Sequence, residues 1–282
     1  MVRGAAALLA QLGEPWQSGR VAVNGGHLAY HRTGGGGQAL VLAHGLTDNG
    51  LCWARTAQAL QKQFDVVMLD ARGHGDSVRM SNGQSSDPAS DIAQAIEALS
   101  LTAPIVLGHS VGALAVADLA AANPGLVAKV ILEDPPWLAN PPPTDTAERQ
   151  QRFCQQVAAF ATQTDAELTA QGQQLSPGWH TDEFPAWVLG KRQVDPAALP
   201  DWDAQWKSTA AAITAPTLLL YGEPEHGGLV SVQVADEAKR LNPGIEAVQI
   251  RGAGHNVRRE NFYGFMAAVR SFLGAESWGD DA

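Results

Sequence analysis

Short runs of apolar and β-branched residues recur along the chain, and longer stretches of helical composition separate them. Runs such as Ala39–Ala43 are apolar at nearly every position, which is typical of strands covered on both faces of a sheet. The predicted strands are Arg20–Asn24, Leu28–Thr33, Ala39–Ala43, Asp65–Leu69, Ile105–Leu107, Lys129–Leu132, Thr217–Tyr221 and Ala247–Ile250. This alternation predicts an α/β fold, in which a mostly parallel sheet has helices on both faces.

The interval from about Trp137 to Ala212 contains no strong strand candidate. It opens with a proline cluster, which neither a helix nor a central strand can accommodate, and continues with helical stretches such as Thr146–Thr162. Five of the eight tryptophans lie in this interval, and disordered segments are poor in aromatic residues. We therefore expect a helical cap at residues 137–212, inserted into a core made of residues 1–136 and 213–282.

Composition narrows the functional class. The net charge of −10 disfavours a nucleic-acid partner, which would need clustered Lys and Arg, and no apolar run approaches the roughly 20 residues that span a bilayer. The first twelve residues fit an N-terminal helix better than a signal peptide. Cys52 and Cys154 form no CxxC pair, which indicates a reducing, cytoplasmic location. The histidines lack metal-ligand spacing, so we expect no metal.

The sharpest motif is GHSVG, which runs from Gly108 to Gly112 between an apolar strand and an alanine-rich helix. A tight strand-to-helix turn exposes its serine at the carboxyl end of the sheet, and flanking glycines leave room for that turn. The helix behind it directs N–H groups towards developing negative charge. This context predicts that Ser110 is a nucleophile.

Two further segments supply the partners that a serine nucleophile needs. AHGLTDNG follows the strand that ends at Ala43, and we assign the N–H groups of Leu46 and Val111 as the two oxyanion donors, with His44 structural. In RGAGHNVRRE, His255 follows a strand and precedes the last helix. Its late position gives the order serine, acid, histidine that this architecture uses, which predicts His255 as the general base.

In this order and spacing, the segments HG, DARGHGDS, GHSVG and GAGH resemble the α/β-hydrolase superfamily over nearly the whole chain. The resemblance implies a mostly parallel eight-stranded sheet, a cap after strand six, no cofactor, and a serine triad that includes Ser110 and His255. A serine at the turn argues against the haloalkane dehalogenase and epoxide hydrolase branches, which use an aspartate there.

The acid of this triad has three candidates. The usual position after strand seven holds Gly222-Glu223-Pro224-Glu225, so Glu225 stands where an Asp is common. The end of strand six offers Glu133 and Asp134, and Asp134 resembles the acid of zearalenone-type lactonases. We rank Asp134 first, Glu225 as the alternative, and Glu133 last.

These residues predict a serine esterase or lactonase, because the same groups attack a carboxylic ester and a cyclic one. A carbon–carbon bond hydrolase with the same triad and a non-catalytic ligand-binding protein remain alternatives. We expect tryptophans of the cap to line the substrate pocket, namely Trp179, Trp187, Trp202 and Trp206. A pocket of large aromatic rings favours a small uncharged, hydrophobic substrate, larger than an acetyl ester.

Overall fold

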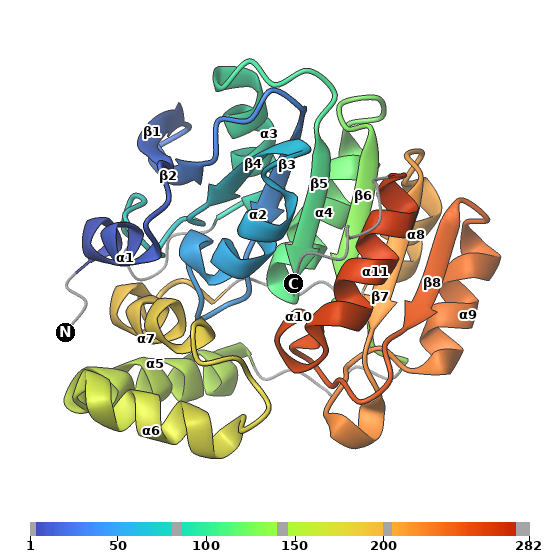
Figure 1. Ribbon diagram of the computed structural model, residues 1–282. Coiled ribbons are helices and arrows are strands. Elements are labelled where there is room, and N and C mark those ends of the chain that lie inside the picture. Colours follow the sequence, from blue (N-terminus) through green and yellow to red (C-terminus); the bar gives the residue numbers. More distant parts are fainter. Residues whose placement is uncertain (1–3, 81–85, 140–145, 200–204, 275–282) are drawn as a thin grey trace.

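The computed structural model describes residues 4–80, 86–139, 146–199 and 205–274. In these residues a single eight-stranded sheet forms the centre of the molecule (Figure 1). Its order is β1-β2-β4-β3-β5-β6-β7-β8; β2 pairs antiparallel with β1 and β4, and all other pairs are parallel. The strands are β1 (Gln17–Val23), β2 (Gly26–Arg32), β3 (Gln38–Ala43), β4 (Phe64–Leu69), β5 (Ile105–His109), β6 (Lys129–Glu133), β7 (Thr217–Tyr221) and β8 (Ile245–Gln249). The predicted mostly parallel eight-stranded sheet is confirmed.

Helices cover both faces of this sheet, because successive residues of each central strand point to opposite sides. Leu219 of β7 packs into one apolar core, and its neighbours Leu218 and Leu220 pack into the other. The first core receives α3 (Pro88–Ala98), α4 (Val111–Ala122), α8 (Trp206–Ala212) and α9 (Val232–Leu241). The second receives α1 (Ala5–Leu12), α2 (Ala54–Leu60), which follows the 3-10 turn η1 (Gly50–Trp53), and α11 (Phe262–Leu273). The central strands β3 and β7 are therefore largely apolar, as the sequence pattern indicated.

Among the described residues, four helices lie between β6 and β7, and they do not form one unit. The helices α5 (Thr146–Thr162), α6 (Asp165–Leu175) and α7 (Glu183–Gln193) pack together beside the sheet, at the lower left of Figure 1. The fourth helix, α8, packs instead against α4 and α9 on the sheet. The predicted cap range of 137–212 thus includes a helix that belongs to the core, because apolar residues of α8 face the sheet.

Truncation of a central core side chain should destabilise the fold measurably. Leu219 is completely buried, so Leu219→Ala should lower the free energy of unfolding by about 2–5 kcal/mol through lost burial and a residual cavity. Leu175, which is 71% exposed, is the matched control, and Leu175→Ala should change it by no more than about 0.5 kcal/mol. Urea unfolding of the three proteins measures both values, and equal values for the two variants would contradict this description of the core.

Candidate active site

Ser110 occupies a strained turn between the last residue of β5 and the first residue of α4. Its backbone adopts φ 54° and ψ −123°, a conformation that a residue with a side chain rarely takes. Two glycines permit the turn: a Cβ at position 108 would lie 2.2 Å from the carbonyl oxygen of Gly112, and one at position 112 would lie 2.4 Å from that of Ala43. The turn presents a serine that is 9% exposed at the carboxyl edge of the sheet.

The side chains of Ser110, His255 and Asp134 form a continuous hydrogen-bonded chain. His255 lies between β8 and α10 (Val257–Glu260), and its Nδ1 donates to Oδ2 of Asp134 over 2.7 Å. Its Nε2 lies 3.1 Å from Oγ of Ser110 and can accept the hydroxyl proton. The imidazole therefore stands between a hydroxyl and a carboxylate, in the arrangement that a general base requires.

Of the three candidate acids, the structure brings only Asp134 to His255. Asp134 is fully buried, takes φ 41°, and also accepts hydrogen bonds from the N–H groups of Leu229 and Val230, at 2.8 and 3.1 Å. Glu133, one residue earlier, points elsewhere and accepts from Arg258. Glu225 is exposed in the 3-10 turn η2 (Pro224–His226), and no described contact joins it to His255.

Two histidines hold the oxyanion loop, residues 44–49. This loop carries Leu46, the predicted oxyanion donor. The ring of His44 donates from Nδ1 to the carbonyl of Gly45 at 2.8 Å and accepts from the N–H of Ala71 at 2.9 Å. His74 donates from Nε2 to the carbonyl of Leu46. Burial lowers the pKa of His44 to about 3 and also lowers the pKa of His74. Both rings are therefore neutral braces near pH 7, which for His44 is the structural role expected from the sequence.

His109 precedes the serine, but its ring hydrogen-bonds to a backbone carbonyl and the hydroxyl of Ser110 has His255 as its partner. The Nε2 of His109 donates to the backbone carbonyl of His255 at 3.0 Å, and the two imidazole centroids lie 4.8 Å apart. Burial, together with the charge of Arg258, holds the pKa of His109 well below its ordinary value. His109 is thus a neutral side chain that supports the segment bearing His255.

The three predicted pocket tryptophans that the structure describes lie in two different environments. Trp179 and Trp187 pack edge to face, with centroids 6.5 Å apart, and Trp179 also stacks on Phe184. Trp206 belongs to the core, where it stacks on Trp137 at 5.2 Å and donates to the carbonyl of Leu138. Trp202 lies outside the described residues. No described contact joins any of these rings to Ser110, so their role as a substrate pocket stays a prediction.

Sequence reasoning missed a set of buried charges beside this site. Arg258 and Arg259 follow His255 and are 1% and 2% exposed, and both contact Asp48 of the oxyanion loop. In the sequence these residues have the appearance of an ordinary solvated charge run. Within the described part of the chain, no group of three or more His, Cys, Asp and Glu could hold a metal ion, and no helix is long and apolar enough to cross a membrane.

Residues 38–261 match the family described as the alpha/beta hydrolase fold. The chain belongs to that family. It is 30% identical to N-formylmaleamate deformylase of Pseudomonas putida, over 90% of this chain and 96% of that protein. It is 27% identical to pimeloyl-[acyl-carrier protein] methyl ester esterase of Vibrio campbellii, over 84% of this chain and 95% of that protein. This α/β hydrolase therefore has relatives with both ester and formyl substrates.

The solved structures agree with the fold. The crystal structure of E-2-(acetamidomethylene)succinate hydrolase superimposes with a TM-score of 0.73 at 24% identity, over 92% of this chain and all of that one. At this level of identity the likeness concerns the arrangement of strands and helices in the α/β hydrolase, and it leaves the substrate open.

Replacement of the acid should distinguish Asp134 from Glu225. Asp134→Asn would allow the amide to hold His255 in the wrong tautomer, so kcat should fall by about 10^4-fold, as in the well-studied serine triad. Glu225→Gln, at an exposed residue without contact to His255, should change kcat less than about twofold. Steady-state hydrolysis of a nitrophenyl ester gives both numbers, and the reverse ranking would place the acid after β7.

Proposed function

We propose that this chain is a serine hydrolase that cleaves a carboxylic ester or lactone of a small hydrophobic molecule through an acyl-enzyme on Ser110. The observation that carries the proposal is the hydrogen-bonded chain from Ser110 through His255 to Asp134, at 3.1 and 2.7 Å. Its position at the carboxyl edge of the parallel strands, at a strained turn, supports a catalytic rather than a structural role.

Each proton in the reaction has a place in this geometry. His255 Nε2 takes the hydroxyl proton as Ser110 Oγ attacks the substrate carbonyl carbon, and Asp134 stabilises the imidazolium that results. Collapse of the tetrahedral intermediate breaks the bond to the alcohol oxygen, which leaves with the proton from His255. Water, deprotonated by the same imidazole, then attacks the acyl carbon. Collapse of this second intermediate breaks the bond to Ser110 Oγ, which regains a proton from His255 as the acid is released.

The negative charge of the intermediate needs donors, and we assign these to the N–H groups of Leu46 and Val111. Val111 is the first residue of α4, so the helix dipole adds to the attraction. His74 fixes the carbonyl of Leu46, which keeps the oxyanion loop rigid before the charge develops. One donor of this kind contributes about 3–4 kcal/mol to catalysis in comparable sites.

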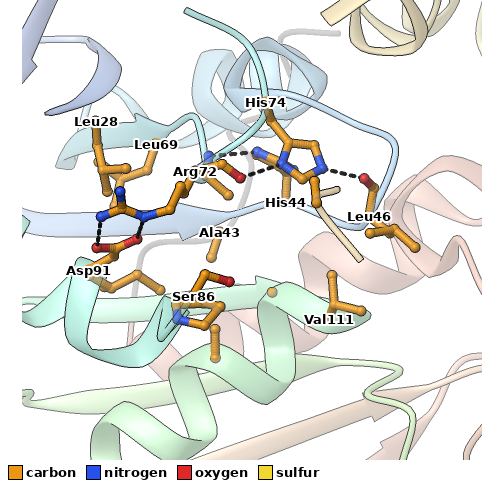
Figure 2. Close-up of a pocket in the computed structure, with 16 residues that line it drawn as sticks. Leu28, Ala43, His44, Leu46, Leu69, Arg72, His74, Ser86, Asp91 and Val111 are labelled. Carbon is orange, nitrogen blue, oxygen red and sulfur yellow. Dashed lines mark hydrogen bonds and ion pairs between the residues drawn. The ribbon is translucent and has the colours of Figure 1, made fainter. Parts of the chain in front are cut away.

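A small cavity beside Leu46 and Val111 is suited to the acyl group (Figure 2). Its volume is about 60 Å³, well below the ~150 Å³ of an apolar cavity that admits a benzene ring. Its walls are mostly apolar, with Leu69, Ile92 and Ala115 among them. This size favours a short acyl chain, so a bulky substrate of the kind expected from the tryptophans would place its bulk in the alcohol part.

The charged residues of this cavity bind one another. The guanidinium of Arg72 donates two hydrogen bonds to the carboxylate of Asp91, at 2.9 and 2.7 Å (Figure 2). It donates a third to the carbonyl of Asn24. A neutralised pair offers little attraction to a charged ligand, which supports an uncharged acyl group.

Hydrolysis of an N-acyl bond is the second candidate. It is favoured by the 30% identity to a protein named N-formylmaleamate deformylase, and a formyl group would fit a cavity of about 60 Å³. The triad could act on both bond types, with the histidine donating its proton to the leaving nitrogen instead of oxygen. Comparison of kcat/KM for matched N-formyl, N-acetyl and ester substrates distinguishes the two functions.

Removal of the nucleophile should abolish turnover without unfolding the protein. Ser110→Ala should lower kcat by at least about 10^4-fold and prevent labelling by a fluorophosphonate probe. Ser18 is a matched control, since its hydroxyl lies 2.7 Å from Nδ1 of His31 but on the regular strand β1. Ser18→Ala should keep full activity and labelling. Retained labelling in the Ser110 variant, detected by peptide mass spectrometry, would refute the assignment.

The acyl cavity makes chain length a direct test of how the substrate binds. For nitrophenyl esters, kcat/KM should be highest between acetate and butyrate and fall at least about tenfold at decanoate, which exceeds ~60 Å³. Ala115→Leu should shift the optimum towards acetate by filling the cavity. A decanoate preference that Ala115→Leu leaves unchanged would mean that the acyl chain binds elsewhere.

A further inference from the structure

Six buried charged side chains lie together where α7 meets the oxyanion loop and the segment that follows His255. None is more than 5% exposed, and they comprise three anions and three cations. They are Asp48, Glu133, Glu183, Lys191, Arg258 and Arg259. Buried charges are tolerated when they are paired, so the equal numbers of each sign stabilise the group as a whole.

Asp48 is the shared anion of this cluster. Its Oδ2 lies 3.3 Å from Nη2 of Arg258 and 3.1 Å from Nη1 of Arg259, and its Oδ1 lies 3.6 Å from Nζ of Lys191. Burial acts to raise the pKa of Asp48, but the three surrounding cations outweigh it and hold that pKa well below its usual range. The carboxylate therefore stays ionised throughout the neutral range.

The contacts of Asp48 connect two parts of the candidate active site. Asp48 stands two residues after Leu46 in the oxyanion loop, and Arg258 stands three residues after His255. Arg258 is fixed in turn by Glu133, which accepts from its backbone N–H at 2.8 Å and from Nη1 at 2.9 Å. Glu133 directly precedes Asp134. One carboxylate thus connects the loop of the oxyanion donor to the segments of the base and of the acid.

The helix α7 closes the cluster from the cap side. Lys191 Nζ donates to the carbonyl and the hydroxyl of Thr47, at 2.9 and 2.7 Å, and Glu183 accepts from Arg259 at 3.2 Å. Helix and loop touch so closely that a Cβ at position 190 would lie 2.9 Å from the carbonyl oxygen of Thr47. The oxyanion loop is therefore held between α7 and the arginines that follow His255.

From these contacts we propose that Asp48 is a positioning residue for the reaction. It holds the oxyanion loop and the segment of His255 at the relative position that the reaction needs. The proposal rests on the proposed function of Ser110. With a neutral side chain at position 48, three buried cations would face two anions, and their repulsion would separate the oxyanion loop from the segment that carries His255. Displacement of a catalytic group by about 1 Å can slow turnover by about 10^2-fold.

The test compares Asp48→Asn with Asp65→Asn. Asp65 is a matched control because it is also buried, at 6% exposure, and accepts from Arg32, but it stands at the opposite end of the sheet from Ser110, near the start of β4. Both variants should lose thermal stability. Only Asp48→Asn should lower kcat, by about 10- to 100-fold, with KM within about threefold of wild type. A kcat within twofold of wild type, or an effect confined to KM, would overturn the proposal.

Two further measurements keep the result unambiguous. Should Asp48→Asn fail to fold, Lys191→Met removes a second tie to the oxyanion loop and should lower kcat in the same direction. The rate at which a fluorophosphonate labels Ser110 should fall at least about tenfold in Asp48→Asn and stay unchanged in Asp65→Asn. This rate needs no substrate, so it tests Asp48 even if the protein hydrolyses neither esters nor amides, which would contradict the proposed function alone.

Discussion

A Cβ atom at position 112 would lie 2.4 Å from the carbonyl oxygen of Ala43 and 2.5 Å from that of His44. The first turn of α4 can therefore contact the end of β3 only because residue 112 is glycine. This contact places the serine at the start of α4 beside the loop that follows β3, and Leu46 and Val111 line the same cavity. Nucleophile and proposed oxyanion donors thus depend on one close approach of two backbones.

Two residues that the proposed mechanism uses have a strained backbone. Ser110 and Asp134 both adopt positive φ, at 54° and 41°, although each has a side chain. Such a conformation costs about 1–3 kcal/mol, so the surrounding structure must hold it in place. The strand β6, which ends just before Asp134, is held by β5 on one side and by β7 on the other. The N–H of Asp134 also donates to the carbonyl of Leu220. The sheet thereby aims both side chains at His255.

Charge has a different role on each side of the site. Around the proposed acyl cavity, Arg72 and Asp91 neutralise one another and the walls stay apolar. On the side of α7, several charged side chains are buried together. There Asp48 contacts Lys191 of α7 and the two arginines that follow His255. The first arrangement suits a neutral acyl group, and the second suits a rigid connection between the cap helix and the core.

Much of this was readable from the sequence, because local patterns encode local structure. The apolar runs predicted the eight strands, and GHSVG between a strand and a helix predicted the turn at Ser110, since the chemistry and the backbone need the same glycines there. His255 was identifiable from its place after the last strand. These features are determined within about ten residues of chain, so periodicity and turn composition suffice.

The tertiary structure decided what depends on segments meeting across the fold. Asp134 and Glu225 each follow a strand and have similar sequence context, and only the packing of β6 beside β5 puts one of them 2.7 Å from His255. The sequence predicts Trp206 as a cap residue, whereas the structure places it in the core because α8 packs on the sheet. Arg258 and Arg259 resemble surface charges in the sequence, whereas in the structure they are buried against Asp48. Partners separated by 120 or more positions, such as His255 and Asp134 at 121, leave no periodic trace in the sequence, because only the folded chain brings them together.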